Sequence, residues 1–175
     1  ALYWRQTKPV PRLDVLAHRG VWTLPAVLLV LLAFGRFRST LSLLKELHTL
    51  KFTALAALLI SIKWGVFLFA VTNGRATEAS LGYFMLPILT AMAGVIVFRE
   101  HPTRPQQVAM VLAVLAVAVQ LVAAGTLPVV SLTLSISFAT YSVIRKYIRA
   151  DAIQGLFMES LFLMPVGATW LLLHQ

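Results

Sequence analysis

Long apolar stretches alternate with short polar ones along the whole chain. Six of the apolar stretches are about 20 residues long, which is the length an α-helix needs to cross the hydrocarbon of a bilayer. Each is too long for a strand, and the short alternating segments of an outer-membrane barrel are not seen. The pattern predicts an all-α integral membrane protein, a bundle of six complete transmembrane helices over residues 15–34, 52–72, 79–98, 106–124, 129–148 and 155–174.

The distribution of Lys and Arg over the polar segments predicts how these helices are oriented. One set of alternating loops holds four bases (residues 1–14, 73–78 and 125–128). The other set holds nine (residues 35–51, 99–105 and 145–154). Cytoplasmic loops carry the excess of Lys and Arg, so we expect the second set in the cytoplasm, with Arg145 and Lys146 as anchors. Membrane orientation explains the net charge of +9, and no nucleic acid partner is expected.

Composition narrows the picture further. With 59% hydrophobic and 12% charged residues, the chain differs from a soluble globular domain, in which about a quarter of the residues are charged. It has no Cys, which removes disulfides and thiolate metal sites. The chain starts at Ala1 rather than at Met, and we interpret it as a fragment of a longer protein.

The first and last of the six stretches resemble each other. A shift of 140 residues places Val15–Leu32 on Gly155–Leu172 without gaps, with Pro25 on Pro165 and Arg19 on Glu159. Their separation by five spans makes the two helices cross the membrane in opposite directions. This is the pattern of an inverted-topology repeat, which is common in secondary transporters. It predicts a parent protein of ten helices in two five-helix units.

Apart from Arg145 and Lys146, which are counted with the loop 145–154, three charged residues lie inside predicted spans, where a charge costs about 2.5–3.5 kcal/mol on insertion scales. Arg19 either snorkels or pairs locally, or it faces a polar cavity and binds an anionic group. Lys63 and Glu159 each serve either a structural ion pair or that cavity, and Lys63 or a Ser is the expected structural partner of Glu159. His18 lies next to Arg19 in the same predicted helix and could couple transport to pH.

Several further residues are candidates for the cavity. A helix after residue 75 is expected to bend or open near Pro87, and with the preceding loop it supplies Asn73, Glu78, Ser80, Tyr83 and Pro87. Aromatic side chains that serve either the helix bundle or a ligand are Trp22, Trp64 and Tyr141. Small residues predict close helix packing; they are Ala109, Ala113 and Ala116, with Gly82 and Gly94 in the preceding span.

Signals for enzyme chemistry are absent from the sequence. It has no Gly-rich phosphate loop, no nucleophile elbow and no His, Asp and Glu set at metal-binding spacing. We therefore predict a protein that is not an enzyme and that uses no cofactor, metal or catalytic residue. Two alternatives stay open: a membrane scaffold or assembly subunit whose buried charges fix helix pairing, and an integral-membrane enzyme that acts on lipid.

Five segments carry a family resemblance: "LAHRGVW", "KWGVFLFAVTNG", "EASLGYFMLPIL", "SFATYSVIRK" and "MESLFLMPVGA". They resemble the RarD branch of the drug/metabolite transporter superfamily, whose members contain EamA domains. The resemblance implies a ten-helix inner-membrane exporter of small molecules. Residues 1–124 would then form the first EamA repeat without most of its first helix, and residues 127–175 the first two helices of the second.

The family pattern also bears on single residues. It includes the pair His18–Arg19, an aromatic at Trp22, the pair Arg145–Lys146, and Glu78, Ser80, Tyr83, Pro87 and Glu159. The chain departs from it twice, with Lys63 where Asn is usual and Arg99 where Gly is common. Together the residues and the resemblance predict a secondary transporter that works by alternating access around a central polar cavity, with a small-molecule substrate. Proton coupling through Glu159 or His18 is part of this interpretation, and whether the protein forms a homodimer stays open.

Overall fold

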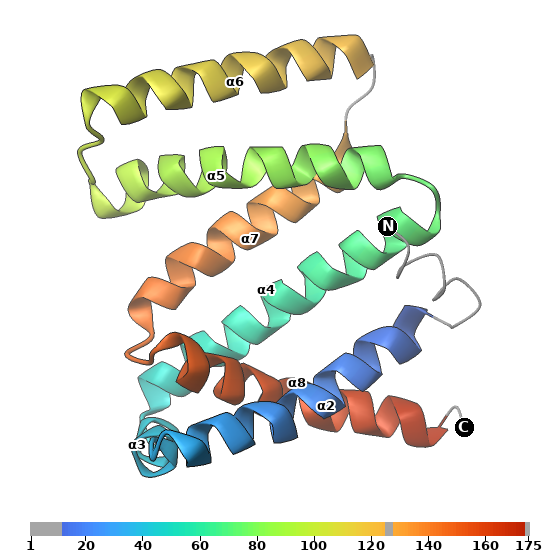
Figure 1. Ribbon diagram of the computed structural model, residues 1–175, viewed down its shortest axis with the longest axis vertical. Helices are drawn as coiled ribbons and strands as arrows, with labels where there is room; N and C mark the ends of the chain where they lie inside the picture. The colour runs from blue at the N-terminus through green and yellow to red at the C-terminus, as the bar shows by residue number, and fades with distance from the viewer. Residues whose placement is uncertain (1–11, 125–127, 174–175) are drawn as a thin grey trace. The chain divides into compact units, whose positions relative to one another are not determined.

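The computed structural model describes residues 12–124 and 128–173, which form seven helices (Figure 1). The helices are α2 (Arg12–Ala33), α3 (Phe37–Leu43), α4 (Leu47–Thr72), α5 (Ala76–Phe98), α6 (Arg104–Ala124), α7 (Val129–Tyr147) and α8 (Ala152–Leu173). The described residues contain no strand. The predicted all-α class is confirmed, while the predicted loops 1–14 and 125–128 lie largely outside the described residues.

Each predicted span coincides with a helix, and four of the described helices are long and apolar enough to cross a membrane. These four are Leu13–Ala33, Leu47–Thr72, Ala76–Phe98 and Ala152–Leu173. The apolar part of α6 is shorter, Arg104–Gln120. Helix α7 is not among the four that are long and apolar enough to cross a membrane. Six complete spans therefore stay a prediction.

Serine and threonine make α7 less apolar than the other long helices, and four of their hydroxyls donate to backbone carbonyls, those of Ser131, Thr133, Ser135 and Ser137. Ser131 Oγ donates to the carbonyl of Glu78 on α5 at 2.6 Å. Ser135 and Ser137 are buried and donate to carbonyls of the preceding turn of α7, at 2.7 and 3.1 Å. Hydroxyls satisfied in this way remove the main cost of placing them in an apolar surrounding.

Except for α7, the long helices begin earlier than the predicted apolar stretches do. For example, α4 starts at Leu47, whereas the apolar stretch starts at residue 52. In this polar first turn, Leu50 N donates to the Glu46 carbonyl at 2.9 Å, and Thr49 Oγ1 donates to Glu46 Oε2 at 2.9 Å. Apolarity marks the part of a helix that suits lipid, and it leaves out the polar turns at the ends.

The described residues group into two compact units. The first contains the residues up to Ser61 and from Ile144 onward, and the second is Ile62–Val143. The continuous helices α4 and α7 each contribute to both units.

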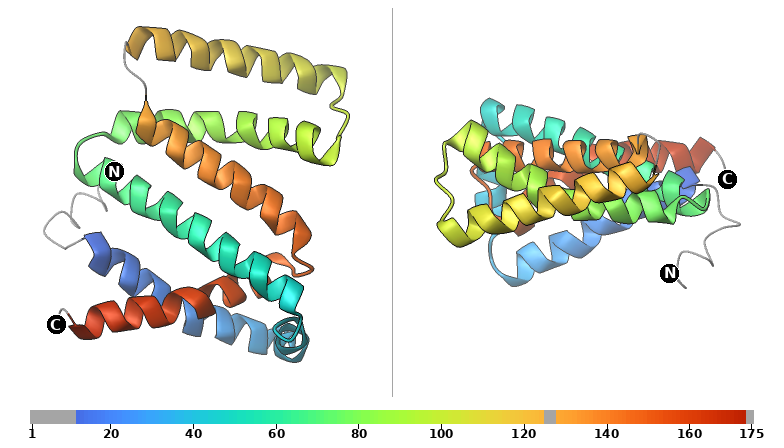
Figure 2. Two further views of the ribbon diagram at one scale, coloured as in Figure 1. Left: turned by 180° about the vertical axis from the view of Figure 1, so that it is seen from behind. Right: turned by 90° about the horizontal axis from the view of Figure 1, so that it is seen from above.

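In the first unit, α2 and α8 run antiparallel side by side, as the two opposite views of the ribbon agree (Figures 1 and 2). Asp14 Oδ1 accepts a hydrogen bond from Trp170 Nε1 at 2.8 Å near one end of the pair. A Cβ on Gly167 would lie 2.9 Å from the carbonyl oxygen of Ala17, so the two backbones nearly touch there. Towards the other end, the pair packs through the buried side chains of Val27, Leu31, Phe157 and Met158.

In the second unit, α5 packs closely against α7. A Cβ on Gly82 would lie 3.1 Å from both the Cα and the carbonyl oxygen of Ser131, so the predicted role of Gly82 in close packing is confirmed. The buried core between these helices and α4 consists of Ala70, Ala79, Val130 and Leu134. Helix α6 contacts α5 (Figure 1).

The small-residue face of α6 does not have the predicted helix neighbour within the described residues. Ala109 and Ala116 are exposed, and Ala113 is half-buried. Spacing alone identifies a face that allows close approach, but it does not identify a partner.

Three residues with positive φ end helices or follow their ends. Gly35 (φ 65°) and Gly74 (φ 76°) follow α2 and α4, and Arg36 and Arg75 then donate backbone bonds to Leu31 and Ala70 at 2.9 and 2.8 Å. This is the Schellman arrangement, which favours glycine. Arg99, at φ 52°, ends α5 in the same left-handed region, and it is a position where the family resemblance implies Gly.

We expect Arg99→Gly to raise the free energy of unfolding by about 1 kcal/mol, because a side chain with a Cβ is strained in the left-handed region. Denaturant titration in detergent micelles measures the change. Arg99→Ala is the matched control, since it removes the charge and keeps the Cβ. Equal effects of the two substitutions would show that charge, and not backbone strain, decides stability at this position.

Candidate functional site

Lys63 is the buried charge that lies deepest in a helix. It is nine residues from the end of α4 at Thr72, a distance of about 14 Å at 1.5 Å per residue. The residue is only 7% exposed. A charged ammonium at such a place needs compensation by its surroundings.

Aromatic rings from three helices surround the Lys63 ammonium. Its Nζ lies 4.3 Å from the ring centroid of Phe138 on α7, 5.3 Å from that of Tyr83 on α5 and 5.4 Å from that of Trp64 on α4. A cation within about 6 Å of a ring face is attracted by the ring quadrupole, and more strongly when desolvated. We call Trp64, Phe67, Tyr83 and Phe138 the ring set.

Ring contacts join three members of the ring set to one another, and the fourth, Phe138, packs against Tyr141. Phe67 lies edge-to-face with Trp64 and with Tyr83, each at 5.7 Å between centroids, an arrangement that aromatic pairs favour. Phe138 and Tyr141 lie three residues apart on α7, with centroids at 5.6 Å. Because α5 approaches α7 closely at Gly82, the next residue, Tyr83, has its ring beside the Lys63 ammonium.

The other candidates around α5 make local contacts at helix ends. Glu78 accepts bonds from Arg75 Nε and Nη2 at 2.6 and 2.9 Å. Asn73 donates to the Phe69 carbonyl at 2.8 Å, and Ser80 to that of Ala76 at 3.0 Å. Pro87 lies inside α5 and is exposed. Of this predicted group, Tyr83 has its ring beside the Lys63 ammonium.

In the first unit, Glu159 forms a buried ion pair with Arg145. Arg145 Nη1 lies 3.7 Å from Glu159 Oε1, and the two side chains are 18% and 4% exposed. Arg145 comes from the last turn of α7. Gly155 makes the pair possible, because a Cβ there would overlap the Arg145 guanidinium.

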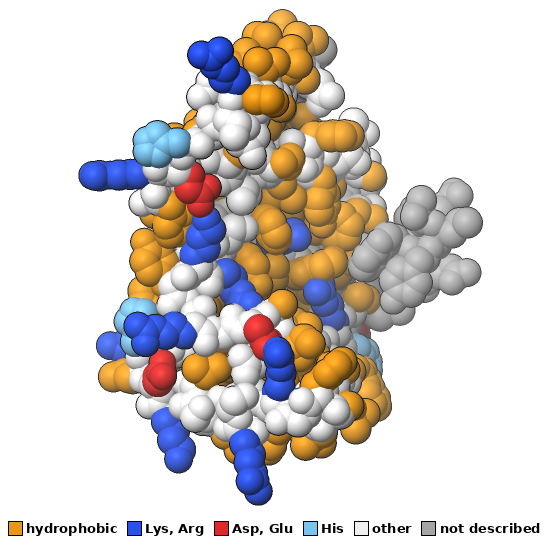
Figure 3. All heavy atoms as spheres, turned by 60° about the vertical axis from the view of Figure 1, so that its left-hand side comes forward, with side chains coloured by type: hydrophobic (Ala, Val, Ile, Leu, Met, Phe, Trp, Pro, Cys, Tyr) orange, Lys and Arg blue, Asp and Glu red, His pale blue; other side chains and the backbone are white. Residues whose placement is uncertain are grey.

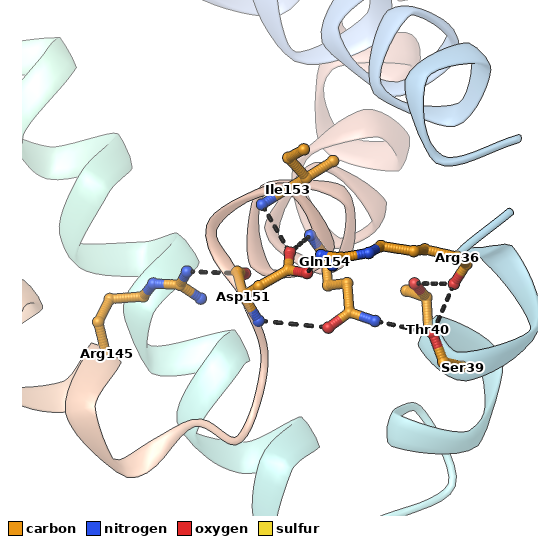
Figure 4. Close-up of polar contacts among 7 residues, drawn as sticks. All are labelled: Arg36, Ser39, Thr40, Arg145, Asp151, Ile153 and Gln154. Atoms are coloured by element: carbon orange, nitrogen blue, oxygen red, sulfur yellow. Dashed lines mark hydrogen bonds and ion pairs between the residues drawn. The ribbon is translucent and has the colours of Figure 1, made fainter. Parts of the chain in front are cut away.

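Asp151, in the loop before α8, connects this pair to α3 (Figure 4). Its carbonyl accepts a bond from Arg145 Nη2 at 3.2 Å, and its carboxylate pairs with Arg36. Gln154 Nε2 donates to Ser39 Oγ on α3 at 3.0 Å. These bonds tie the start of α3 to the start of α8.

The carboxylate of Asp151 also caps α8. Its Oδ1 accepts backbone bonds from Ile153 and Gln154 at 3.0 and 2.9 Å, and Gln154 Oε1 accepts from the Asp151 N–H at 3.2 Å. This reciprocal pair is a capping box. The backbone bond from Gln154, opposed by partial burial and helped by Arg36, lowers the pKa of Asp151. Folding therefore gains stability from the ionised form above the unfolded pKa and loses it as pH falls through the folded one.

The candidates His18, Arg19 and Trp22 all lie on α2. His18 and Arg19 are exposed, and Trp22 is 67% exposed. The pairing of Gly20 with Leu163 and of Ala17 with Gly167 places Arg19 opposite Met164 or Pro165. Glu159 precedes Met164 by five residues in α8, which is roughly 7.5 Å along the helix axis. Lys146, unlike its neighbour Arg145, is exposed.

The exposed bases lie mainly in the polar segments. In the first unit, Arg36, Lys45 and Arg149 are exposed in loops, and Arg38 is exposed on the short helix α3. Figure 3 shows Lys and Arg side chains standing out from one face of the molecule, with fewer acidic ones among them.

Sequence reasoning missed Phe138, Asp151 and Gln154. Phe138 carries a weak signal, its spacing of three residues from Tyr141, which places both on one helix face. Asp151 and Gln154 carry a stronger one: an acid followed three residues later by Gln, directly before an apolar run, is the sequence form of a capping box.

Comparison with known proteins places the chain. Residues 2–122 match the EamA-like transporter family. The chain is 41% identical over 173 residues to Protein RarD of Streptomyces exfoliatus, covering 97% of this chain and 55% of that protein. It is 33% identical over 174 residues to an uncharacterized transporter of Bacillus subtilis, covering 98% of this chain and 58% of that protein. It is 30% identical over 169 residues to the chloramphenicol-sensitive protein RarD of Pseudomonas aeruginosa, covering 94% and 56%.

The chain spans little more than half the length of these relatives. No solved structure matches it. The family match and the apolar helices agree on an integral, multi-pass membrane protein, and the predicted resemblance to the RarD branch is confirmed. The chain belongs to the EamA-like transporter family.

Proposed function

We propose that this chain is part of a secondary transporter of small molecules in the bacterial inner membrane. The observation that carries the proposal is the match of residues 2–122 to a transporter family, in a chain with four helices able to span a membrane. Several relatives are named as uncharacterized transporters. We infer export of drugs or metabolites, without a cofactor.

Alternating access between two inverted repeats is the proposed mechanism. Its support is the correspondence of α2 with α8: both have 22 residues, their bounds differ by 140 residues at each end, and Pro25 and Pro165 occupy the same place in each. The parent would have ten helices, with residues 1–124 in the first repeat and 127–175 in the second. The basic loops 35–51, 99–105 and 145–154 would face the cytoplasm.

The proposed cavity residues are Arg19, Lys63, Tyr83 and Glu159. Burial of a charge inside a span supports this role for Lys63 and Glu159. Glu159 or His18 is the proposed proton-coupling group. A structural role of the buried pair would instead favour the scaffold alternative, and the experiment separates the two.

The test is transport by the complete protein in proteoliposomes, with and without a pH gradient. A panel of small molecules serves as cargo, and chloramphenicol is included because the name of one relative contains it. We expect Glu159→Gln and Lys63→Met to reduce transport more than Glu78→Gln, the control at an acid whose side chain is 30% exposed. A transport rate that is the same with and without the pH gradient would refute proton coupling. Loss of transport that always follows loss of folded protein would favour the scaffold.

A further inference from the structure

The ring set around Lys63 has the form of a site for an ammonium ion. Proteins recognise ammonium ligands with several aromatic rings whose faces surround the cation. Here the ring centroids of Trp64, Tyr83 and Phe138 lie 4.3–5.4 Å from Nζ. The cation that occupies this site is a side chain of the chain itself.

The occupied site has a positive charge beside apolar ring faces. Lys63 is nearly buried, but Tyr83 is 38% exposed and both Trp64 and Phe138 are half-buried. A second cation near the ammonium would meet like-charge repulsion, which is strong where water is scarce. An organic anion would meet an opposite charge, and its planar body could stack on the rings.

We propose that Lys63 sets the charge preference of a ligand site at the ring set, so that the site takes small organic anions with a planar apolar body and rejects organic cations. Without the Lys63 ammonium, the same rings form a site for organic cations. This inference rests on the proposed function, because it names the substrate class of that transporter. The departure from the family pattern at Lys63, where Asn is usual, then changes which charge the protein accepts.

Three probes of one shape and three charges test the proposal: benzoate, benzamide and benzylammonium. Their binding to the complete protein in nanodiscs at neutral pH is measured by isothermal titration calorimetry. For the wild type we expect benzoate to bind about tenfold more tightly than benzylammonium, the scale of one desolvated cation–π or charge contact, with benzamide between them. For Lys63→Met we expect the order to reverse.

Three further variants control for structural effects. Lys63→Arg keeps the charge and should keep the anion preference. Lys51→Met removes an exposed base from the same helix and should leave the order unchanged. Phe138→Leu in the Lys63→Met background removes the nearest ring and should weaken benzylammonium about tenfold. General unfolding weakens all probes together, whereas the proposal requires their order to change.

Several results would overturn the inference. They are a wild type that binds none of the probes, one that prefers benzylammonium or ignores charge, and a folded Lys63→Met that still prefers benzoate. The wild-type order decides the matter if Lys63→Met does not fold. Transport without any charge preference would refute the inference and leave the proposed function standing. Charge-selective binding without transport of any cargo would support the inference and refute the proposed function.

Discussion

Glu159→Gln is expected to lower the free energy of unfolding by about 3–5 kcal/mol, because it leaves the Arg145 guanidinium buried without its countercharge. The Glu159 side chain is 4% exposed and that of Arg145 is 18% exposed, so water cannot replace the lost partner. Among the described residues, Arg145 Nη1 has no hydrogen bond, and at 3.7 Å its contact with Glu159 is an ion pair rather than a hydrogen bond. The countercharge is therefore the main compensation for this atom.

A double-mutant cycle measures the coupling. We expect Arg145→Met and Glu159→Leu each to destabilise the protein, and the double variant to lose clearly less than the sum of the two, because replacing both charges removes the desolvation penalty as well. The exposed pair Arg75–Glu78 is the matched control, and Glu78→Gln should cost about 0–1 kcal/mol. Additive losses in the buried pair would show that the two side chains do not stabilise each other.

Gly167→Ala is expected to lower the free energy of unfolding by about 1–3 kcal/mol, which is the usual cost of overpacking. The new Cβ would lie 2.9 Å from the carbonyl oxygen and 3.2 Å from the Cα of Ala17. These are backbone atoms, so no side chain can turn away, and α2 and α8 would have to separate. Denaturant titration in micelles measures the loss.

Gly65 provides the control for this substitution. It also lies inside a long helix, α4, but nothing stands within 4 Å of its Cβ position. Gly65→Ala should therefore be neutral or stabilise the protein by up to about 1 kcal/mol, as expected for Gly→Ala in a helix. Similar losses at both positions would mean that close approach of α2 to α8 does not explain the cost at Gly167.

In each unit the sequence predicts the buried charge but not the residues that surround it. Lys63 and Glu159 are evident from sequence because each is a charge inside an apolar run, and the cost of such a charge depends on its position alone. Their neighbours are not evident. Phe138 looks like any apolar residue of a membrane helix, and only the approach of α7 at Gly82 gives it a role.

Arg145 illustrates why sequence polarity predicts helix ends poorly. Its place beside Lys146 suggests a basic loop, yet α7 continues to Tyr147 and the two side chains diverge, one buried and one exposed. What turns Arg145 inward is the absence of a side chain at Gly155 on the next helix. Such a gap between two helices is a property of their packing, and no local pattern in either segment records it.

Because α2 and α8 correspond residue by residue, the two ends of the contact between them can be compared with each other. A two-fold relation that exchanges the helices turns the contact of Ala17 with Gly167 into that of Val27 with Phe157, because each number shifts by 140. One contact joins the smallest side chains and brings backbone atoms together, whereas the other joins large side chains in a buried cluster. The pair is therefore a wedge, narrow at one end and filled with side chains at the other. If these helices tilt against each other, the narrow end is the pivot, and the wide end, next to Glu159 and Asp151, moves furthest.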